Sequence, residues 1–165
     1  MTTNNTSHPD TADREIIQTR LLNAPRELVY EVWTNPEHVI NWWGPNGFST
    51  TTYEMEVKPG GVWRFMMHGP DGTDYPNKMV FEEVTANEKL VYTHSADKED
   101  GHSFHVTVTF EEQEGKTLLT MRSVFRTAEE RNMVIEKYGA LEGGRQTLSR
   151  LEAYLSTHIN KTTTL

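Results

Sequence analysis

The sequence predicts an α+β domain in which a curved antiparallel sheet of about seven strands packs against one long C-terminal helix. Between about Phe48 and Arg126, apolar and polar residues alternate with a period of two, which is typical of half-buried strands. From about Thr127 to Ile159 the apolar spacing changes to three, four and seven residues, the pattern of one helical face. A single amphipathic helix needs a curved sheet to lie on. We therefore expect two layers, with the helix across the concave face of the sheet.

The N-terminal part of the domain is predicted to hold one strand followed by two short helices. Glu15–Leu22 has β-branched residues and makes the first strand, but both of its faces carry apolar residues, so its register stays open. Pro25 is expected at the first helical position, where its missing N–H does no harm. The Asn-Pro at 35–36 ends that helix and opens a second one, which the Gly-Pro at 44–45 stops.

Six further strands are separated by short turn signals rich in glycine, including a Gly-Pro-Asp-Gly sequence. Strands joined by tight turns pair with their neighbours, so we expect an antiparallel meander. The first strand of this series is expected to bury Tyr53, Met55 and Val57 and to expose Thr52 and Glu54.

The long helix is expected to begin with a capping box formed by Thr127 and Glu130. Gly139, Gly143 and Gly144 interrupt its apolar stripe. Each glycine inside a helix costs about 1 kcal/mol relative to alanine. These glycines therefore indicate either a bend or a place where another group comes very near the helix backbone.

One domain, spanning residues 14–159, is expected in this chain of 165 residues. Residues 1–13 are polar and lack periodicity, which predicts a disordered tail, and residues 160–165 are expected to fray.

No apolar run reaches the roughly 18 residues of a membrane span and no signal peptide is visible, so we expect a cytoplasmic protein without a membrane partner. The net charge of -8 argues against a nucleic-acid partner. The absence of cysteine excludes disulfides and thiolate metal ligands.

Several segments of the chain together resemble one protein family. They are Ala-Pro-Arg-Glu-Leu-Val-Tyr at 24–30, Trp-Thr-Asn-Pro-Glu at 33–37, Trp-Trp-Gly-Pro at 42–45, Pro-Gly-Gly-Val-Trp-Arg-Phe at 59–65, Phe-Glu-Glu-Val at 81–84 and Gly-Gly-Arg-Gln-Thr-Leu-Ser-Arg-Leu at 143–151. In this order they are similar to the START-like (SRPBCC, helix-grip) superfamily, in its branch of Hsp90-ATPase-activator homologues. The resemblance implies a helix-grip fold whose cavity, between sheet and C-terminal helix, accepts a small hydrophobic or aromatic ligand. Hsp90 activation is not expected, because the additional N-terminal domain of the eukaryotic co-chaperones is not seen here.

The inward-facing residues support such a cavity, because many are aromatic rings or methionines, which make large and adaptable apolar surfaces. The residues expected to bind the ligand are Trp42, Trp43, Trp63, Phe65, Met67, Met79, Phe81, Phe104, Val106, Met121, Tyr138, Leu141, Gly144, Arg145 and Leu148. Trp42 and Trp43 diverge by about 100° on a helix, so one can anchor the core while the other lines the cavity mouth. Arg145 is the candidate for an acidic end of the ligand. The alternative is that the apolar residues pack into a closed core.

Two other function classes stay open. A cyclase/aromatase- or hydrolase-like enzyme would use His68, Asp74 and Tyr75, beside the turn of one hairpin, as acid–base groups. Strand alternation, however, turns His68 away from the inward aromatic residues. A co-chaperone-like interaction module would use the outer face of the sheet, where residues such as Thr107 are ordinary solvated ones. No set of residues is forced to converge, so binding without catalysis is the expected function; weak homodimerisation stays open.

No metal and no cofactor is expected. His102 and His105 lie three apart on a predicted strand and therefore face opposite sides of the sheet. His94 and His102 flank one charged loop, but no third ligand is evident and both are expected to be solvated. The sequence also lacks a phosphate-binding glycine loop and a nucleophile elbow.

Overall fold

A computed structural model describes residues 11–97 and 103–163 of the chain. Its elements are the 3-10 turn η1 (Ala12–Arg14), β1 (Glu15–Leu22), α1 (Arg26–Thr34), α2 (Pro36–Val39), β2 (Ser49–Met55), β3 (Val62–His68), β4 (Asp74–Thr85), β5 (Lys89–Ala96), β6 (Ser103–Gln113), β7 (Lys116–Val124), α3 (Ala128–Tyr138) and α4 (Ala140–Thr163). The strands form one seven-stranded antiparallel sheet in the order β1-β7-β6-β5-β4-β3-β2. The predicted α+β fold class and the meander are confirmed.

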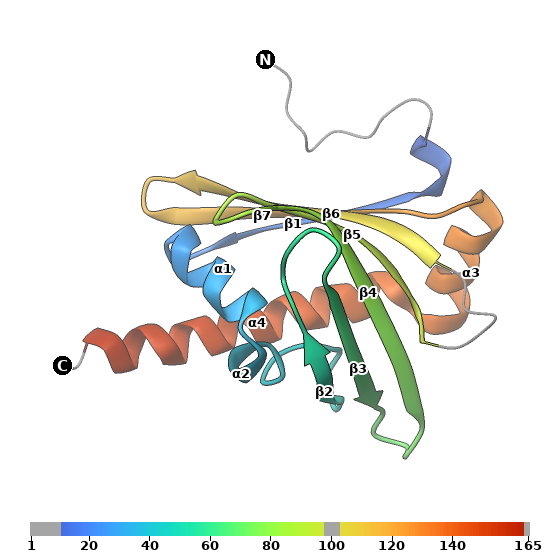
Figure 1. The fold of residues 1–165 in the computed structure, drawn as a ribbon, viewed down its shortest axis with the longest axis horizontal. Helices are drawn as coiled ribbons and strands as arrows, with labels where there is room; N and C mark the ends of the chain where they lie inside the picture. The colour runs from blue at the N-terminus through green and yellow to red at the C-terminus, as the bar shows by residue number, and fades with distance from the viewer. Residues whose placement is uncertain (1–10, 98–102, 164–165) are drawn as a thin grey trace.

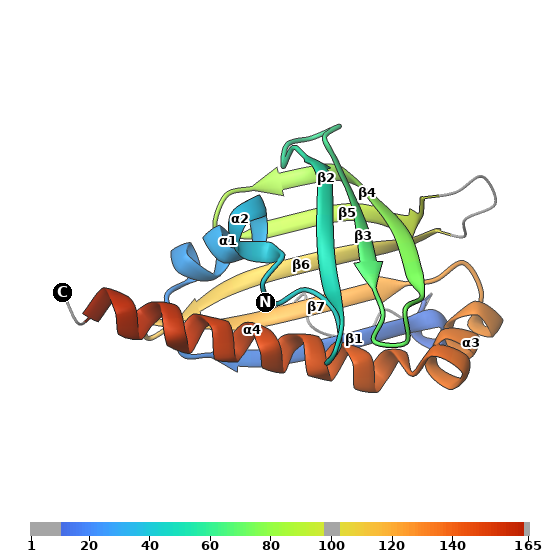
Figure 2. The same ribbon diagram turned by 90° about the horizontal axis from the view of Figure 1, so that it is seen from below.

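The sheet curves around its helices. Figures 1 and 2 show α4 running along the concave side next to β1, with α1 and α2 on the same side of the sheet and α3 at one end of it. The hydrophobic core fills the space between the layers and contains Trp33, Trp42, Trp43, Trp63, Phe65, Phe110, Leu148 and Leu151. The tryptophan rings pack edge to face, a favourable geometry for aromatic pairs, with the Trp33 and Trp42 centroids 5.0 Å apart.

The strand β2 departs from the predicted alternation at a bulge. The β2–β3 register shifts between Thr52 and Glu54, which leaves Tyr53 outside the ladder and 55% exposed. Thr52 turns inward instead, where its hydroxyl accepts a hydrogen bond from Trp63 Nε1 at 3.1 Å. The predicted inward position of Tyr53 and outward position of Thr52 are therefore wrong, since one extra residue reverses the faces of a strand. Met55, beyond the bulge, packs against the core as expected.

The predicted long helix is two helices joined at Gly139. Thr127 caps α3, its hydroxyl accepting a hydrogen bond from the Glu130 backbone N–H at 3.0 Å, as the capping box predicts. Gly139 then adopts the left-handed conformation, with φ 61° and ψ 41°, and ends α3. A residue with a Cβ rarely takes these angles. The predicted continuous helix is wrong, and the first of the two alternatives for the glycines, a bend, occurs at Gly139.

Some predicted boundaries also shift. Pro25 is the residue before α1, with an extended backbone, so the helix starts one residue later than expected. η1 at residues 12–14 overlaps the end of the predicted N-terminal tail, while residues 1–10 lie outside the described part of the chain. The helix α4 continues to Thr163, into the segment that was expected to fray.

The glycine pair of α4 allows a close approach to β1. A Cβ at Gly144 would lie only 2.6 Å from the Gln18 amide nitrogen, which donates a hydrogen bond to the Leu141 carbonyl at 3.1 Å. A Cβ at Gly143 would instead meet only the Pro45 ring, at 3.4 Å, an ordinary contact. Gly144 therefore leaves room for Gln18, and Gly143 has no equivalent constraint.

The two glycines give a matched pair of variants. Gly143→Ala is expected to raise the free energy of unfolding by up to about 1 kcal/mol, since alanine favours the helix and fits the space. Gly144→Ala must displace Gln18, and is expected to be at least about 1 kcal/mol less stable than Gly143→Ala because the bond to Leu141 is lost. Urea denaturation measures both. Adding Gln18→Ala should relieve the Gly144→Ala defect; equal stability of the two single variants would contradict the close approach.

Candidate ligand cavity

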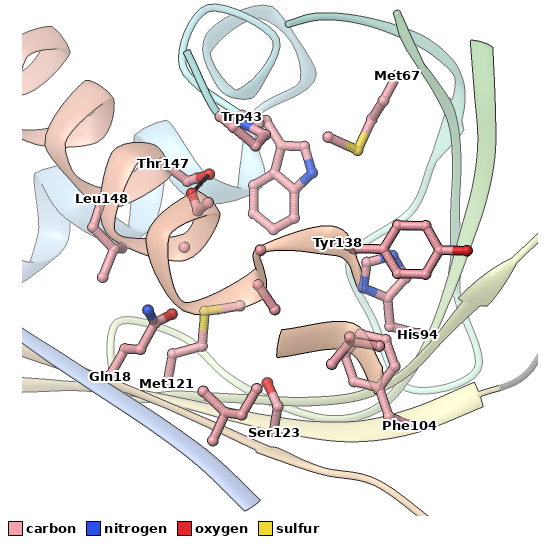
Figure 3. A pocket seen from close by; sticks show the side chains of 18 of the residues that line it. Gln18, Trp43, Met67, His94, Phe104, Met121, Ser123, Tyr138, Thr147 and Leu148 are labelled. Carbon is pink, nitrogen blue, oxygen red and sulfur yellow. Dashed lines mark hydrogen bonds between the residues drawn. The ribbon is translucent and has the colours of Figure 1, made fainter. Parts of the chain in front are cut away.

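A cavity of about 450 Å3 lies at the end of the domain where α3 joins α4. It is lined by Ile16, Gln18, Trp33, Trp43, Gly44, Pro45, Met67, Asn77, His94, Phe104, Met121, Ser123, Phe125, Val134, Tyr138, Gly139, Ala140, Gly143, Gly144, Thr147 and Leu148. Most of these residues are apolar. Figure 3 shows the side chains converging from the sheet, from the helices and from the loop that carries Trp43.

The cavity exists because small residues stand where the helices pass over the sheet. The bend at Gly139 carries α3 around the end of the sheet, and Ala140, Gly143 and Gly144 present little bulk at the start of α4. The facing wall comes from neighbouring strands. The register pairs Ile16 of β1 with Ser123 of β7, so that both face the same side of the sheet.

The loop after α2 forms another wall and is held by Arg150 of α4. One guanidinium nitrogen, Nη1, donates hydrogen bonds to the carbonyls of Gly44 and Pro45 at 2.8 and 2.9 Å. Partial burial lowers the pKa of Arg150 from its ordinary value. Three backbone carbonyls, that of Trp43 included, surround this nitrogen. Arg150 therefore anchors the loop with its charge and does not line the cavity.

The two adjacent tryptophans have different roles. Trp42 is fully buried, and its indole nitrogen donates to the Val32 carbonyl at 3.1 Å. Trp43 lines the cavity and packs edge to face on Trp63, with the centroids 5.1 Å apart. Trp42 is thus the core anchor.

His94 of β5 is the titratable imidazole in the cavity wall. It is half-buried, and its Nε2 lies 2.9 Å from the Asn77 side-chain oxygen. Burial lowers the pKa of His94 from 6.5 to about 4, because the charged form is poorly solvated there. The predicted solvated position of His94 is wrong: the strand continues past it to Ala96 and turns its side chain toward the concave face. His102, its expected neighbour, lies outside the described residues.

The predicted ligand-binding residues divide into three groups. Those that line the cavity are Trp43, Met67, Phe104, Met121, Tyr138, Gly144 and Leu148. Those that lie in the packed core, away from the cavity, are Trp42, Trp63, Phe65, Met79, Phe81 and Val106. Leu141 and Arg145 are exposed on α4, where Arg145 pairs with Glu142 instead of reaching the cavity.

Sequence reasoning missed the polar part of the wall, namely Gln18, Asn77, His94, Ser123 and Thr147. Ser123 could have been found, since it shares a strand face with Met121. Gln18 could not, because the register of β1 was open. Asn77 and His94 come from different strands, and their pairing depends on the β4–β5 register, which places Asn77 opposite Ala96 and Met79 opposite His94.

The residues of the enzyme alternative lie outside this cavity. His68 Nδ1 contacts Asp74 Oδ1 at 2.8 Å, and its Nε2 lies 2.9 Å from the Thr51 hydroxyl. These three side chains lie on the neighbouring strands β2, β3 and β4, are largely solvent-exposed, and do not line the cavity. Tyr75 packs near Phe48 instead, with the rings 6.0 Å apart. His68 and Tyr75 therefore do not form one site.

The described part of the chain shows neither a metal-binding group nor a membrane-spanning helix. Among these residues, no three His, Asp or Glu side chains are arranged to hold a metal ion. None of the described helices is both long and apolar enough to cross a bilayer.

The low pKa of His94 predicts a pH dependence of stability. Above about pH 6.5 the imidazole is neutral in both the folded and the unfolded chain and contributes no change. As the pH falls toward 4, the unfolded chain binds a proton that the folded protein does not, so the free energy of unfolding decreases, by up to about 3 kcal/mol. Urea denaturation should show a smaller loss over this range for His94→Gln. Parallel curves for the two proteins would mean that His94 is not held neutral.

The fold of the chain is similar to several solved structures. A protein from Mycobacterium smegmatis is 24% identical, with a TM-score of 0.82 and coverage of 94% of this chain and 98% of its own. A protein from Nitrosomonas europaea is 24% identical with a TM-score of 0.81, over 90% of this chain and 98% of its own. An Arthrobacter aurescens protein is 26% identical with a TM-score of 0.81, over 91% and 90%.

A comparison with curated proteins gives no match. The family model described as "Activator of Hsp90 ATPase homolog 1-like protein" matches residues 23–156, from before α1 into α4. The match includes both helices that follow β1, six of the seven strands and the glycine pair of α4. The chain therefore belongs to the family of activator of Hsp90 ATPase homolog 1-like proteins, within the START-like superfamily.

Proposed function

We propose that this is a cytoplasmic protein that binds a small hydrophobic or aromatic molecule in the cavity between its sheet and the α3–α4 junction. The observation that carries the proposal is the cavity itself: about 450 Å3, with a mostly apolar wall. This volume falls in the range of small-molecule sites, roughly 300–1,000 Å3. Closed cores, by contrast, leave few voids larger than a water molecule.

The chemistry of the wall supports binding rather than turnover. A general base works best when its pKa lies near the operating pH. Burial holds the pKa of His94 at about 4, which makes its imidazole a weak base. The Ser123 hydroxyl lies on β7, and the β5–β6–β7 register sets it two strands away from His94. The cavity thus lacks a paired nucleophile and base among its lining residues.

Thermal denaturation with a panel of ligands tests the proposal. Neutral polycyclic aromatics, flavonoids, steroids and fatty acids would be added to the purified protein. A ligand at a hundred times its dissociation constant is expected to add about 2.7 kcal/mol to the free energy of unfolding.

A cavity-filling variant ties any hit to this site. Ser123→Leu places a larger side chain in the cavity and is expected to remove the stabilisation by ligand. Ser49→Leu, at an exposed position on β2, is the matched control and should retain it. A panel without a hit, or a hit that survives Ser123→Leu unchanged, would overturn the proposal.

A further inference from the structure

The hydrogen bonds of Asn77 determine the orientation of its amide. Its side-chain nitrogen donates to the Tyr75 backbone carbonyl at 2.9 Å. A carbonyl oxygen can only accept, so the amide nitrogen must face it. The amide oxygen is then the atom that lies 2.9 Å from His94 Nε2.

That orientation assigns the tautomer of His94. An amide oxygen can only accept, so Nε2 of the imidazole must carry a proton and donate it. The depressed pKa of His94, which results from burial, keeps the ring uncharged at neutral pH. A neutral imidazole with a protonated Nε2 has a bare lone pair on Nδ1. His94 therefore offers a hydrogen-bond acceptor at its second nitrogen.

This acceptor has no donor among the described residues. The hydrogen bond between His94 and Asn77 uses Nε2, and Nδ1 is not one of the fully buried polar atoms that lack a partner. Nδ1 thus keeps some accessible surface, and the His94 side chain is part of the cavity wall. The ring is held in place by Phe104, with the centroids 4.9 Å apart. Figure 3 shows the imidazole among the side chains of the cavity wall.

The described residues that line the cavity include no charged side chain. None of them is Asp, Glu, Lys or Arg. The nearby guanidinium of Arg150 is used by three backbone carbonyls, and Arg145 pairs with Glu142. Burying an ionised carboxylate without a partner costs several kcal/mol, whereas a neutral hydroxyl needs only a hydrogen-bond partner.

We propose that the cavity selects an uncharged aromatic or polycyclic ligand that carries a hydroxyl group, and that His94 Nδ1 accepts the hydrogen bond of that hydroxyl. The inference rests on the proposed ligand-binding function and adds the chemical class of the ligand. Nδ1 accepts no hydrogen bond from the described residues and lies in a mostly apolar wall. A ligand that covers Nδ1 without donating a hydrogen bond would leave this acceptor desolvated and unsatisfied, so ligands with a donor are favoured.

Three probes that share one ring system test the selection: 2-methylnaphthalene, 2-naphthol and 2-naphthoate. Their dissociation constants are measured by calorimetry at about pH 7, where the naphthol is neutral and the naphthoate is charged. 2-Naphthol is expected to bind more tightly than 2-methylnaphthalene by on the order of fivefold, the value of one neutral hydrogen bond. 2-Naphthoate is expected to bind most weakly.

Two histidine variants separate the hydrogen bond from the shape of the cavity. His94→Phe keeps a flat ring but removes the acceptor, so the ratio of the affinities for 2-naphthol and 2-methylnaphthalene should fall to about one. His105→Phe, on the exposed face of β6, is the matched control and should keep the preference.

A measurement on the unmodified protein covers the case in which His94→Phe does not fold. The 15N resonance of His94 Nδ1 should move when 2-naphthol binds and stay in place with 2-methylnaphthalene. Four outcomes would overturn the selection while the binding function stands. They are equal affinity for these two probes, tightest binding of 2-naphthoate, an unmoved Nδ1 resonance, and a preference for 2-naphthol that persists in His94→Phe. Failure of all three probes to bind the folded protein would overturn both.

Discussion

The contact between α4 and β1 is the constraint on which the rest of the structure depends. Gln18 reaches across to the Leu141 carbonyl, and its amide occupies the space where a side chain at position 144 would begin. This contact places the start of α4 near the edge of the sheet. Because Gly139 turns the chain just before that point, α3 is directed around the end of the sheet instead of continuing along it. The cavity is the space enclosed by this turn.

The glycines therefore have different physical purposes within one short segment. Gly139 supplies a backbone conformation, since its positive φ is unfavourable for residues with a Cβ. Gly144 lets α4 lie close to Gln18 of β1, because any Cβ at position 144 would collide with the Gln18 side chain. Their cost in helix propensity, about 1 kcal/mol each, is offset by the tertiary arrangement that they allow. A helix without these residues would be intrinsically more stable, but it would pack differently on the sheet.

The electrostatics of the cavity depend on which contacts the neighbouring charged side chains make. Two charged side chains of α4 are directed into other contacts instead of the cavity, Arg150 to the loop carbonyls and Arg145 to Glu142. His94 is a titratable residue in the cavity wall, but burial keeps its imidazole neutral. For the ligand proposed above, such a wall offers a hydrogen bond and apolar contacts rather than an ion pair. This property connects the fold to the class of ligand proposed for it.

Local sequence patterns were sufficient to predict the fold class, the order of the strands and most of their inward faces. These depend on local periodicity, which survives in any register: Trp63 and Phe65 are buried as their alternation predicts, and Thr127 caps α3. The prediction failed at Tyr53, where a bulge adds one residue and reverses the faces of the strand. Periodicity carries no signal for such an insertion.

Long-range packing sets which inward residues line the cavity and which fill the core. Trp63 and Met121 share the same kind of strand pattern, but the first is packed under Trp43 and the second borders open space. The polar wall was decided in the same way, since Asn77 meets His94 only through the pairing of β4 with β5. Long-range register and the path of a helix over a sheet set these contacts. Neither quantity is encoded in the local spacing of residues, which is why the sequence alone could predict a cavity but not its chemistry.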